Sequence, residues 1–442
     1  MDLQALDKAP SQDDYLFGSG PAWFAMVMTL GLMVFDYVDR QVIVSLFPYL
    51  KAEWDLSDKQ LGALVSVVSV TVALGALPVA LFADRVSRVK SIVAMATIWS
   101  LATISCMFTR GYGALVAARS VVGLGEAGYG SVGAALIASH FPSRLRAMLL
   151  AGFFASASVG SVLGVMLGGV IATHWGWQAA FGVVGVPGLL LALLYLKVRD
   201  YRTVALAPTL DAKRQSLREA TRHIVKVLTR APTMFWVCVG GAAQLIVVSA
   251  LWSWLPSYLN RVHGVAPAQA GVQAALVVLC GAVGSVLWGA VVDRSGSRRP
   301  RRRLATMALL CLLSMVVLVT AFGLGAGASW QFALIAFGGF LATCSVGPVS
   351  AIVIDVVHPG VRATGSSVLA LFQNLFGLAA GPFIAGMLSD TWGIVPALTA
   401  TPLFALVAAA AFLLAARSYE ADKARANEPL TAAPLAPAAV LA

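Results

Sequence analysis

The chain consists of long apolar runs separated by short polar gaps, and this pattern occurs twelve times along its length. A helix of about 20 apolar residues is long enough to cross the hydrocarbon core of a bilayer. The runs lie near residues 21–50, 58–82, 91–109, 113–140, 145–173, 178–197, 232–260, 268–291, 304–326, 330–355, 362–389 and 394–416. The pattern therefore predicts an all-α integral membrane protein with twelve transmembrane helices.

The composition also indicates a membrane protein, and the placement of its charges argues against a nucleic-acid-binding protein. Of 442 residues, 59% are hydrophobic and 12% are charged, whereas soluble domains carry about 25% charged residues. The net charge of +11 does not form a basic groove on a polar domain. Because the basic residues fall in gaps between apolar runs, they indicate membrane topology rather than a nucleic-acid partner.

The distribution of lysine and arginine predicts the orientation. An even number of spans places both termini on one side of the membrane. The gaps between spans on that side hold 21 lysines and arginines, whereas the gaps on the opposite side hold four. Since cytoplasmic loops carry the excess, we expect both termini in the cytoplasm. The compact chain suggests a multi-pass protein of a bacterial inner membrane, acting as a monomer.

The chain also divides into two similar halves. FPSRLRA before the fifth span has a counterpart in HPGVRAT before the eleventh, and Asp-Arg pairs follow both the second and the eighth spans. Repeats of this kind build transporters from two bundles related by a pseudo-two-fold axis. We expect a cytoplasmic segment at 1–20, six-helix bundles at 21–197 and 231–418, a cytoplasmic linker at 198–230 and a disordered cytoplasmic tail at 419–442.

A glycine-rich stretch in the fourth span, GLGEAG at 123–128, satisfies the G-x-G-x-x-G pattern of dinucleotide sites. That pattern requires a preceding strand and a following helix, and here apolar residues flank it on both sides. We interpret these glycines as helix-packing positions. Gly160, Gly164 and Gly168 of the fifth span, four residues apart on one face, receive the same interpretation.

Five ionisable residues inside two spans are the strongest candidates for function. Asp36, Asp39 and Arg40 share a face of the first span, and Arg119 and Glu126 share a face of the fourth. Such residues normally face a bundle interior or an aqueous cavity and are functional by default. The alternative is a static ion-pair cluster that fixes the first helix against the fourth.

Other kinds of site have little support in the sequence. The five cysteines lie inside apolar runs without C-x-x-C spacing, so neither a zinc site nor a disulfide framework is expected. H-E-x-x-H and G-x-S-x-G motifs are absent, which argues against an intramembrane hydrolase. We expect no enzyme activity, cofactor or metal.

The motifs resemble those of the major facilitator superfamily over nearly all of 20–418. Asp84-Arg85-x-x-Arg88 resembles its loop between the second and third spans, and Gly160/Gly164/Gly168-Gly169 its fifth-span motif. More narrowly, Tyr37-Val38-Asp39-Arg40 and the segment from Arg119 to Tyr129 resemble the N-Y-x-D-R and R-x-x-x-G-x-G-E-A-x-Y motifs of the spinster-like branch. Asp36 stands where that branch usually has Asn, and Ala80 where the loop motif usually begins with Gly.

This resemblance implies a proton-coupled secondary transporter working by alternating access, in a branch associated with lysophospholipids and sphingoid lipids. We assign proton coupling to Asp39 and Glu126, with Asp36 as a further titrating group. Arg40 and Arg119 would be their counter-ions and anchors for an anionic substrate. The expected partners are the substrate, protons and the lipid bilayer.

Two further groups of residues complete the prediction. A cytoplasmic gate is expected from Asp84, Arg85 and Arg88, mirrored by Asp293 and Arg294. Candidates for the substrate cavity are Tyr37, Tyr129, Trp252, Trp254, Tyr258, Phe372, Asn374 and Phe376. Aromatic residues at such spacings also serve as packing or interfacial belt residues.

Two other transport functions stay open. A symporter of protons with sugar acids or similar carboxylates would carry polar groups from the seventh, eighth and eleventh spans in its cavity. A multidrug efflux carrier is the second alternative.

Overall fold

The computed structural model describes residues 15–200, 231–297, 300–324, 329–357 and 362–426, apart from the side chains of residues 77, 80, 81, 84, 85 and 362–364. Twelve helical segments in these residues are long and apolar enough to cross a membrane. The all-α architecture with twelve spans is therefore confirmed.

The first six spans form the N-terminal bundle. They are α1 (Ser19–Val42) continued by the 3₁₀ segment η2 (Ile43–Leu46) and α2 (Phe47–Trp54), then α3 (Asp58–Val86), α4 (Arg88–Cys106), α5 (Tyr112–Glu126) with α6 (Tyr129–His140), α7 (Ser143–Trp175) and α8 (Trp177–Tyr195).

The last six spans form the C-terminal bundle. They are α10 (Pro232–His263), α11 (Pro267–Ser295), α12 (Arg301–Gly323), α13 (Gln331–Ala342) with η3 (Thr343–Ser345) and α14 (Val346–Val356), then α15 (Arg362–Phe372) with the π-helical η5 (Gln373–Leu378) and α16 (Ala380–Trp392), and finally α17 (Ile394–Ala400) with η6 (Thr401–Leu403) and α18 (Phe404–Ala426).

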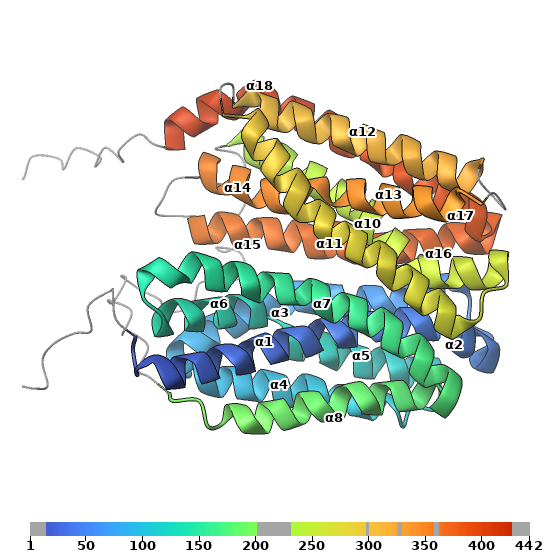
Figure 1. The fold of residues 1–442 in the computed structure, drawn as a ribbon, viewed down its shortest axis with the longest axis horizontal. Coiled ribbons are helices and arrows are strands. Elements are labelled where there is room, and N and C mark those ends of the chain that lie inside the picture. The colour runs from blue at the N-terminus through green and yellow to red at the C-terminus, as the bar shows by residue number, and fades with distance from the viewer. Residues whose placement is uncertain (1–14, 201–230, 298–299, 325–328, 358–361, 427–442) are drawn as a thin grey trace, which may run out of the picture.

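The two bundles lie side by side with their helices roughly parallel to one long direction (Figure 1). The start of α1 and the end of α18 lie at the same end of the molecule, here called the terminal face. The opposite end, where α2, the start of α3 and the end of α16 lie, is called the far face. The contacts between bundles are mainly those of α7 with α11 and of α3 with α16.

Glycines allow the two bundles to approach closely towards the far face. A Cβ placed at Gly169 of α7 would lie 2.7 Å from the carbonyl oxygen of Pro267 in α11. On the other side of the interface, a Cβ at Gly62 of α3 would overlap the carbonyl oxygen of Pro382 in α16. Side chains at these positions would separate the backbones, so the close approach depends on glycine.

The predicted packing role of the fifth-span glycines is confirmed. Gly160, Gly164 and Gly168 of α7 face α1, where a Cβ at Gly164 would lie 2.6 Å from the carbonyl oxygen of Val38 and 2.9 Å from the Cβ of Gln41. The four-residue spacing therefore fixes α7 directly against the part of α1 that carries the charged residues.

The glycines of GLGEAG pack as predicted, but the fourth span is not one continuous helix. A Cβ at Gly125 would lie 2.7 Å from the backbone nitrogen of Trp99 in α4. The helix then breaks at Ala127 and Gly128, where Gly128 has φ +83°. This left-handed conformation is accessible to glycine at little cost, and it ends α5 immediately after Glu126.

The tail is shorter than predicted. Residues 419–442 were expected to be disordered, yet α18 continues to Ala426. Tyr419 and Asp422 are buried, and Asp422 Oδ2 accepts a hydrogen bond of 2.9 Å from the backbone nitrogen of Thr233 at the start of α10. This contact satisfies a free N–H group of α10, so the disorder predicted for 419–426 is wrong. Residues 427–442, and 201–230 of the predicted linker, lie outside the described residues.

We expect Gly164→Ala to lower the free energy of unfolding by about 1–3 kcal/mol, because the new methyl group must push α1 away from α7. Gly152→Ala is the matched control, since a Cβ at Gly152 of the same helix has no neighbour within 4 Å. Thermal unfolding of both purified variants measures the difference. Equal melting temperatures would contradict the packing role.

Candidate functional site

The charged residues of the first and fourth spans meet inside the N-terminal bundle. Asp36, Asp39 and Arg40 lie in the last two turns of α1, and Arg119 and Glu126 lie on α5. Their spacings of three, four and seven residues place each set on one helical face. The two faces are turned towards each other, as the sequence predicted.

One group within this cluster is centred on Asp39. Arg119 Nη1 lies 3.0 Å from Asp39 Oδ1 and 3.2 Å from the Asp39 carbonyl oxygen. Thr103 of α4 donates a hydrogen bond of 2.5 Å to Asp39 Oδ2. All three side chains are buried. Both carboxylate oxygens therefore have donors, and α1, α4 and α5 are joined at one point.

The other group is centred on Arg40. Its Nε lies 3.1 Å from Asp36 Oδ1 and 3.0 Å from Glu126 Oε2. The guanidinium carbon also lies 5.2 Å from the centre of the Tyr37 ring, in cation–π range. The Arg40 side chain is 16% exposed, whereas that of Glu126 is fully buried. Arg40 is thus the member of the cluster that reaches the surface of the bundle.

These distances settle the pairing of the five residues. Arg119 pairs with Asp39, and Arg40 pairs with both Asp36 and Glu126. Three carboxylates and two guanidinium groups therefore share one buried volume, with formal charge −1 when every group is ionised. Buried charge without a partner is costly, so each of the five groups depends on the others for its charge balance.

Thr103 was not predicted. A threonine in an apolar run carries no periodic or motif signal, and only the fold brings it to Asp39. Its position on α4 shows that the third span contributes to the site.

Three of the predicted cavity residues are packed inside the protein in this conformation. Tyr129, Trp254 and Tyr258 are at most 1% exposed. Tyr129 donates to the Thr29 carbonyl oxygen at 2.7 Å and Trp254 Nε1 to that of Pro382 at 3.0 Å. Tyr258 packs edge-to-face on Phe322 inside the C-terminal bundle. Their polar atoms and rings make contacts within the protein in this conformation, and a role in the substrate cavity stays a prediction.

The other candidates remain accessible to different degrees. Tyr37 and Trp252 are half-buried, as are Phe372 and Asn374, while Phe376 is exposed. Asn374 and Phe376 lie on the π-helical segment η5 of the eleventh span. Segments of this kind are frequent at functional sites, and the hydropathy pattern gave no sign of this one.

The predicted gate residues lie at the terminal face, and those with described contacts bind within their own bundles. Arg88 Nη1 donates to Ser139 Oγ of α6 at 3.1 Å, and Asp293 lies 3.4 Å from Arg303 of α12. Arg294 lies in the last turn of α11. The side chains of Asp84 and Arg85 lie outside the described residues, so pairing across the bundles stays a prediction.

The fold and the charge cluster can now be compared with known proteins. Residues 29–382 match the family model described as Major Facilitator Superfamily. The chain belongs to the major facilitator superfamily. Its relatives are transporters rather than enzymes, so the protein is a transporter of this superfamily.

Its relatives include members with different substrates. The chain is similar to an MFS-type efflux pump of Mycolicibacterium smegmatis, with 28% identity over 87% of this chain and 89% of the relative. It is similar to the gallate transporter of Pseudomonas putida, with 27% identity over 88% of this chain and 91% of the relative. The sphingosine-1-phosphate transporter SPNS2 of Mus musculus is 26% identical over 94% of this chain and 81% of the relative.

A solved structure shows the same fold. It is a bacterial homologue of the human lysosomal transporter spinster in an inward-facing, unoccupied conformation, with a TM-score of 0.81 and 23% identity over 92% of this chain and 99% of that one. This likeness shows the fold, and the similarity to SPNS2 confirms the resemblance to the spinster-like branch.

We expect Thr103→Val to lower the free energy of unfolding by about 1–3 kcal/mol, because a buried carboxylate loses a hydrogen bond with little change in side-chain volume. Thr391→Val, at an exposed position of α16, is the control. Thermal unfolding of both variants tests the prediction, and an unchanged melting temperature for Thr103→Val would show that Asp39 does not depend on this donor.

Proposed function

We propose that the protein is a proton-coupled secondary transporter that works by alternating access and moves an amphipathic anion such as a lysophospholipid or sphingoid lipid. The observation that supports this most directly is the buried cluster of three carboxylates and two guanidinium groups. One proton makes this cluster neutral, so proton binding is part of its electrostatic balance.

The geometry favours Glu126 as the proton carrier over Asp39. Both oxygens of Asp39 are bound to donors that stabilise the ionised form. Glu126 contacts Arg40 through Oε2, and its Oε1 accepts no hydrogen bond from the described residues. Because Asp36 also binds Arg40, Arg40 keeps one carboxylate partner when Glu126 is neutral.

Proton and substrate would be coupled through Arg40. A proton on Glu126 removes one of the two carboxylates that hold the guanidinium. Arg40 is then free to bind an anionic headgroup, since a guanidinium forms strong paired hydrogen bonds with phosphate or carboxylate. Its partial exposure gives a substrate access to it, while Arg119 stays buried with Asp39.

The C-terminal bundle supports an amphipathic substrate. Gln244 of α10 is buried and donates to Ser314 Oγ at 3.2 Å and to the Ala342 carbonyl oxygen at 2.9 Å. Ser249 donates to the Gly377 carbonyl oxygen at 3.1 Å. These two donors of the seventh span are therefore used within the bundle and are not free to bind a polar substrate.

The orientation follows from the basic residues. Among the described residues, most lysines and arginines lie at the helix ends of the terminal face, and the face that carries this excess is cytoplasmic. We therefore assign both termini to the cytoplasm and the far face to the outside of a bacterial inner membrane. Contacts between the bundles towards the far face correspond to a conformation closed on the outside, and the protein would act as a monomer.

The main alternative function is a proton–carboxylate symporter, since the gallate transporter is a relative of similar coverage. The second alternative is a drug exporter, since an efflux pump is also a relative. A flux screen in proteoliposomes separates them. We expect labelled lysophospholipid to accumulate against its gradient only when a pH gradient is imposed. Accumulation of gallate or a sugar acid without lysophospholipid flux would favour the carboxylate symporter.

We expect Glu126→Gln to lose pH-driven accumulation while substrate exchange at equal pH continues, because the amide keeps the shape of the carboxyl group and cannot carry the proton. Glu420→Gln is the matched control, since Glu420 lies on the surface in an ion pair with Arg301. Normal pH-driven uptake by Glu126→Gln would remove Glu126 from the mechanism.

A further inference from the structure

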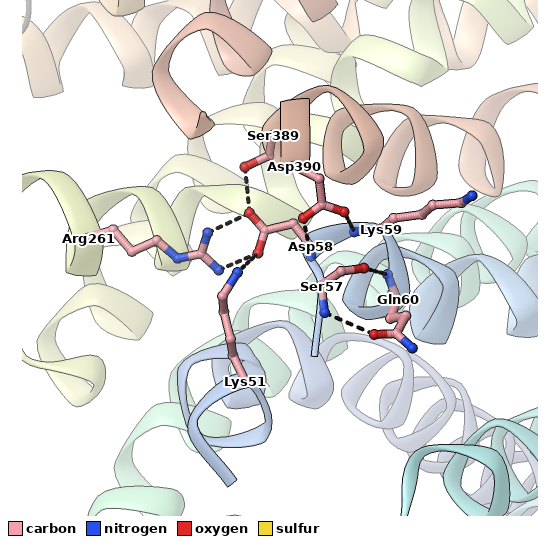
Figure 2. A network of polar contacts seen from close by, with 8 residues as sticks. All are labelled: Lys51, Ser57, Asp58, Lys59, Gln60, Arg261, Ser389 and Asp390. Atoms are coloured by element: carbon pink, nitrogen blue, oxygen red, sulfur yellow. Dashed lines mark hydrogen bonds and ion pairs between the residues drawn. The ribbon is translucent and has the colours of Figure 1, made fainter. Parts of the chain in front are cut away.

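A second buried carboxylate lies at the far face, outside the central charge cluster. Asp58, the first residue of α3, is 4% exposed in its side chain and accepts four hydrogen bonds (Figure 2). Arg261 of α10 donates to it through both Nη atoms, at 2.6 and 2.9 Å. Ser389 of α16 and Lys51 of α2 each donate at 2.5 Å.

A second carboxylate reinforces this junction from the opposite bundle. Asp390 of α16 accepts hydrogen bonds from the backbone nitrogens of Asp58 at 2.7 Å and Lys59 at 2.8 Å. These are free N–H groups of the first turn of α3, which attract an anion. The next free N–H group, that of Gln60, is bound by Ser57 of the same bundle in a capping box.

We call Lys51, Asp58, Arg261, Ser389 and Asp390 the far-face network. Asp58 and Lys51 belong to the N-terminal bundle, and the other three residues belong to the C-terminal bundle. Two of the four bonds to the Asp58 carboxylate come from Arg261 and one from Ser389, so three of the four cross between bundles.

An apolar layer lies against this network. Trp254 of α10 packs on Phe47 of α2 with ring centres 5.1 Å apart, and the Arg261 guanidinium lies 5.8 Å from the Trp254 ring. A Cβ at Gly386 of α16 would meet the backbone of Asp58 and the Trp254 ring. The layer limits access of water to the ion pairs, which strengthens them.

We propose that the far-face network is the outer gate of the transporter, and that Asp58 with Arg261 sets the balance between outward-closed and outward-open molecules. The bundles cannot separate at this face without breaking the paired Arg261 bonds, the Ser389 bond and both Asp390 bonds. Nothing in this step depends on the substrate or on proton coupling.

Lys51 makes the gate reversible. Because Lys51 and Asp58 lie in the same bundle, their ion pair of 2.5 Å is kept when the bundles part. Asp58 is then exposed with one cation still bound, and Arg261, already 25% exposed, is hydrated by solvent. The open state therefore leaves no isolated buried charge, which would be strongly unfavourable.

The test measures distances between spin labels in the purified full chain, without substrate or pH gradient, on a background with its five cysteines replaced by alanine. Ala52→Cys and Thr391→Cys report the far face. Arg144→Cys and Ser366→Cys report the terminal face. All four positions are exposed, and thermal unfolding checks that each variant is folded.

We expect Asp58→Asn and Arg261→Gln to increase the ratio of open to closed far-face populations about tenfold or more, from the loss of charged hydrogen bonds. The terminal-face distance should shorten in the same molecules. Arg261→Lys, which keeps the charge but loses the paired geometry, should give a smaller increase. Asp55→Asn is the matched control, because Asp55 is exposed beside the network in a left-handed conformation that Asn tolerates.

Unchanged distance distributions in folded Asp58→Asn and Arg261→Gln would overturn the proposal, as would an equal response to Asp55→Asn. If Asp58→Asn fails to fold, Arg261→Gln and Ser389→Ala decide instead, and parental ratios in both would reject the gate. Because the spin-label distances are measured without transport, their outcome does not affect the test of proton coupling with Glu126→Gln.

Discussion

The structure depends on keeping ionised groups paired inside an apolar bundle. A charge at the bilayer centre costs roughly 2.5–3.5 kcal/mol on insertion scales, so an unpaired Asp39 or Arg119 would oppose insertion and folding. Their ion pair, completed by Thr103, fixes α1, α4 and α5 to one another. The glycine face of α7 then holds α1 from the other side. The position of Arg40, and therefore the chemistry proposed for it, follows from this arrangement.

The features that were predicted correctly from the sequence are those that depend on residues close together in the chain. The twelve spans follow from apolar runs matched to bilayer thickness, and the role of Gly164 follows from small residues repeated every four positions. The five ionisable residues were found because a charged residue inside an apolar span is energetically costly and therefore indicates a structural or functional role. Their spacing predicted the shared faces, although the exact pairing of Arg40 with Asp36 and Glu126 needed the fold.

The remaining features depend on contacts between residues distant in the chain. Thr103 and Asp58 lie at ordinary positions, and their partners are brought to them only by packing, in the case of Ser389 from the other bundle. Tyr129 and Trp254, predicted to line the cavity, are packed in this conformation, and aromatic spacing alone does not distinguish a cavity wall from a packed core. The last turns of α18 were missed because Asp422 binds α10 through one long-range hydrogen bond.

The central cluster and the far-face network are connected by a short stretch of one span. Arg40 ends the charged face of α1, the 3₁₀ segment Ile43–Leu46 follows, and α2 then carries Phe47 and Lys51 to the far face. A 3₁₀ stretch within a helix often marks a hinge. Because Phe47 contacts Trp254 and Lys51 contacts Asp58, the proposed release of Arg40, if accompanied by a rotation of α1, would be transmitted to both layers of the proposed outer gate. The first span thus contacts Glu126 through Arg40 and contacts the C-terminal bundle through Phe47, so it is the element through which the two proposed functions would be linked.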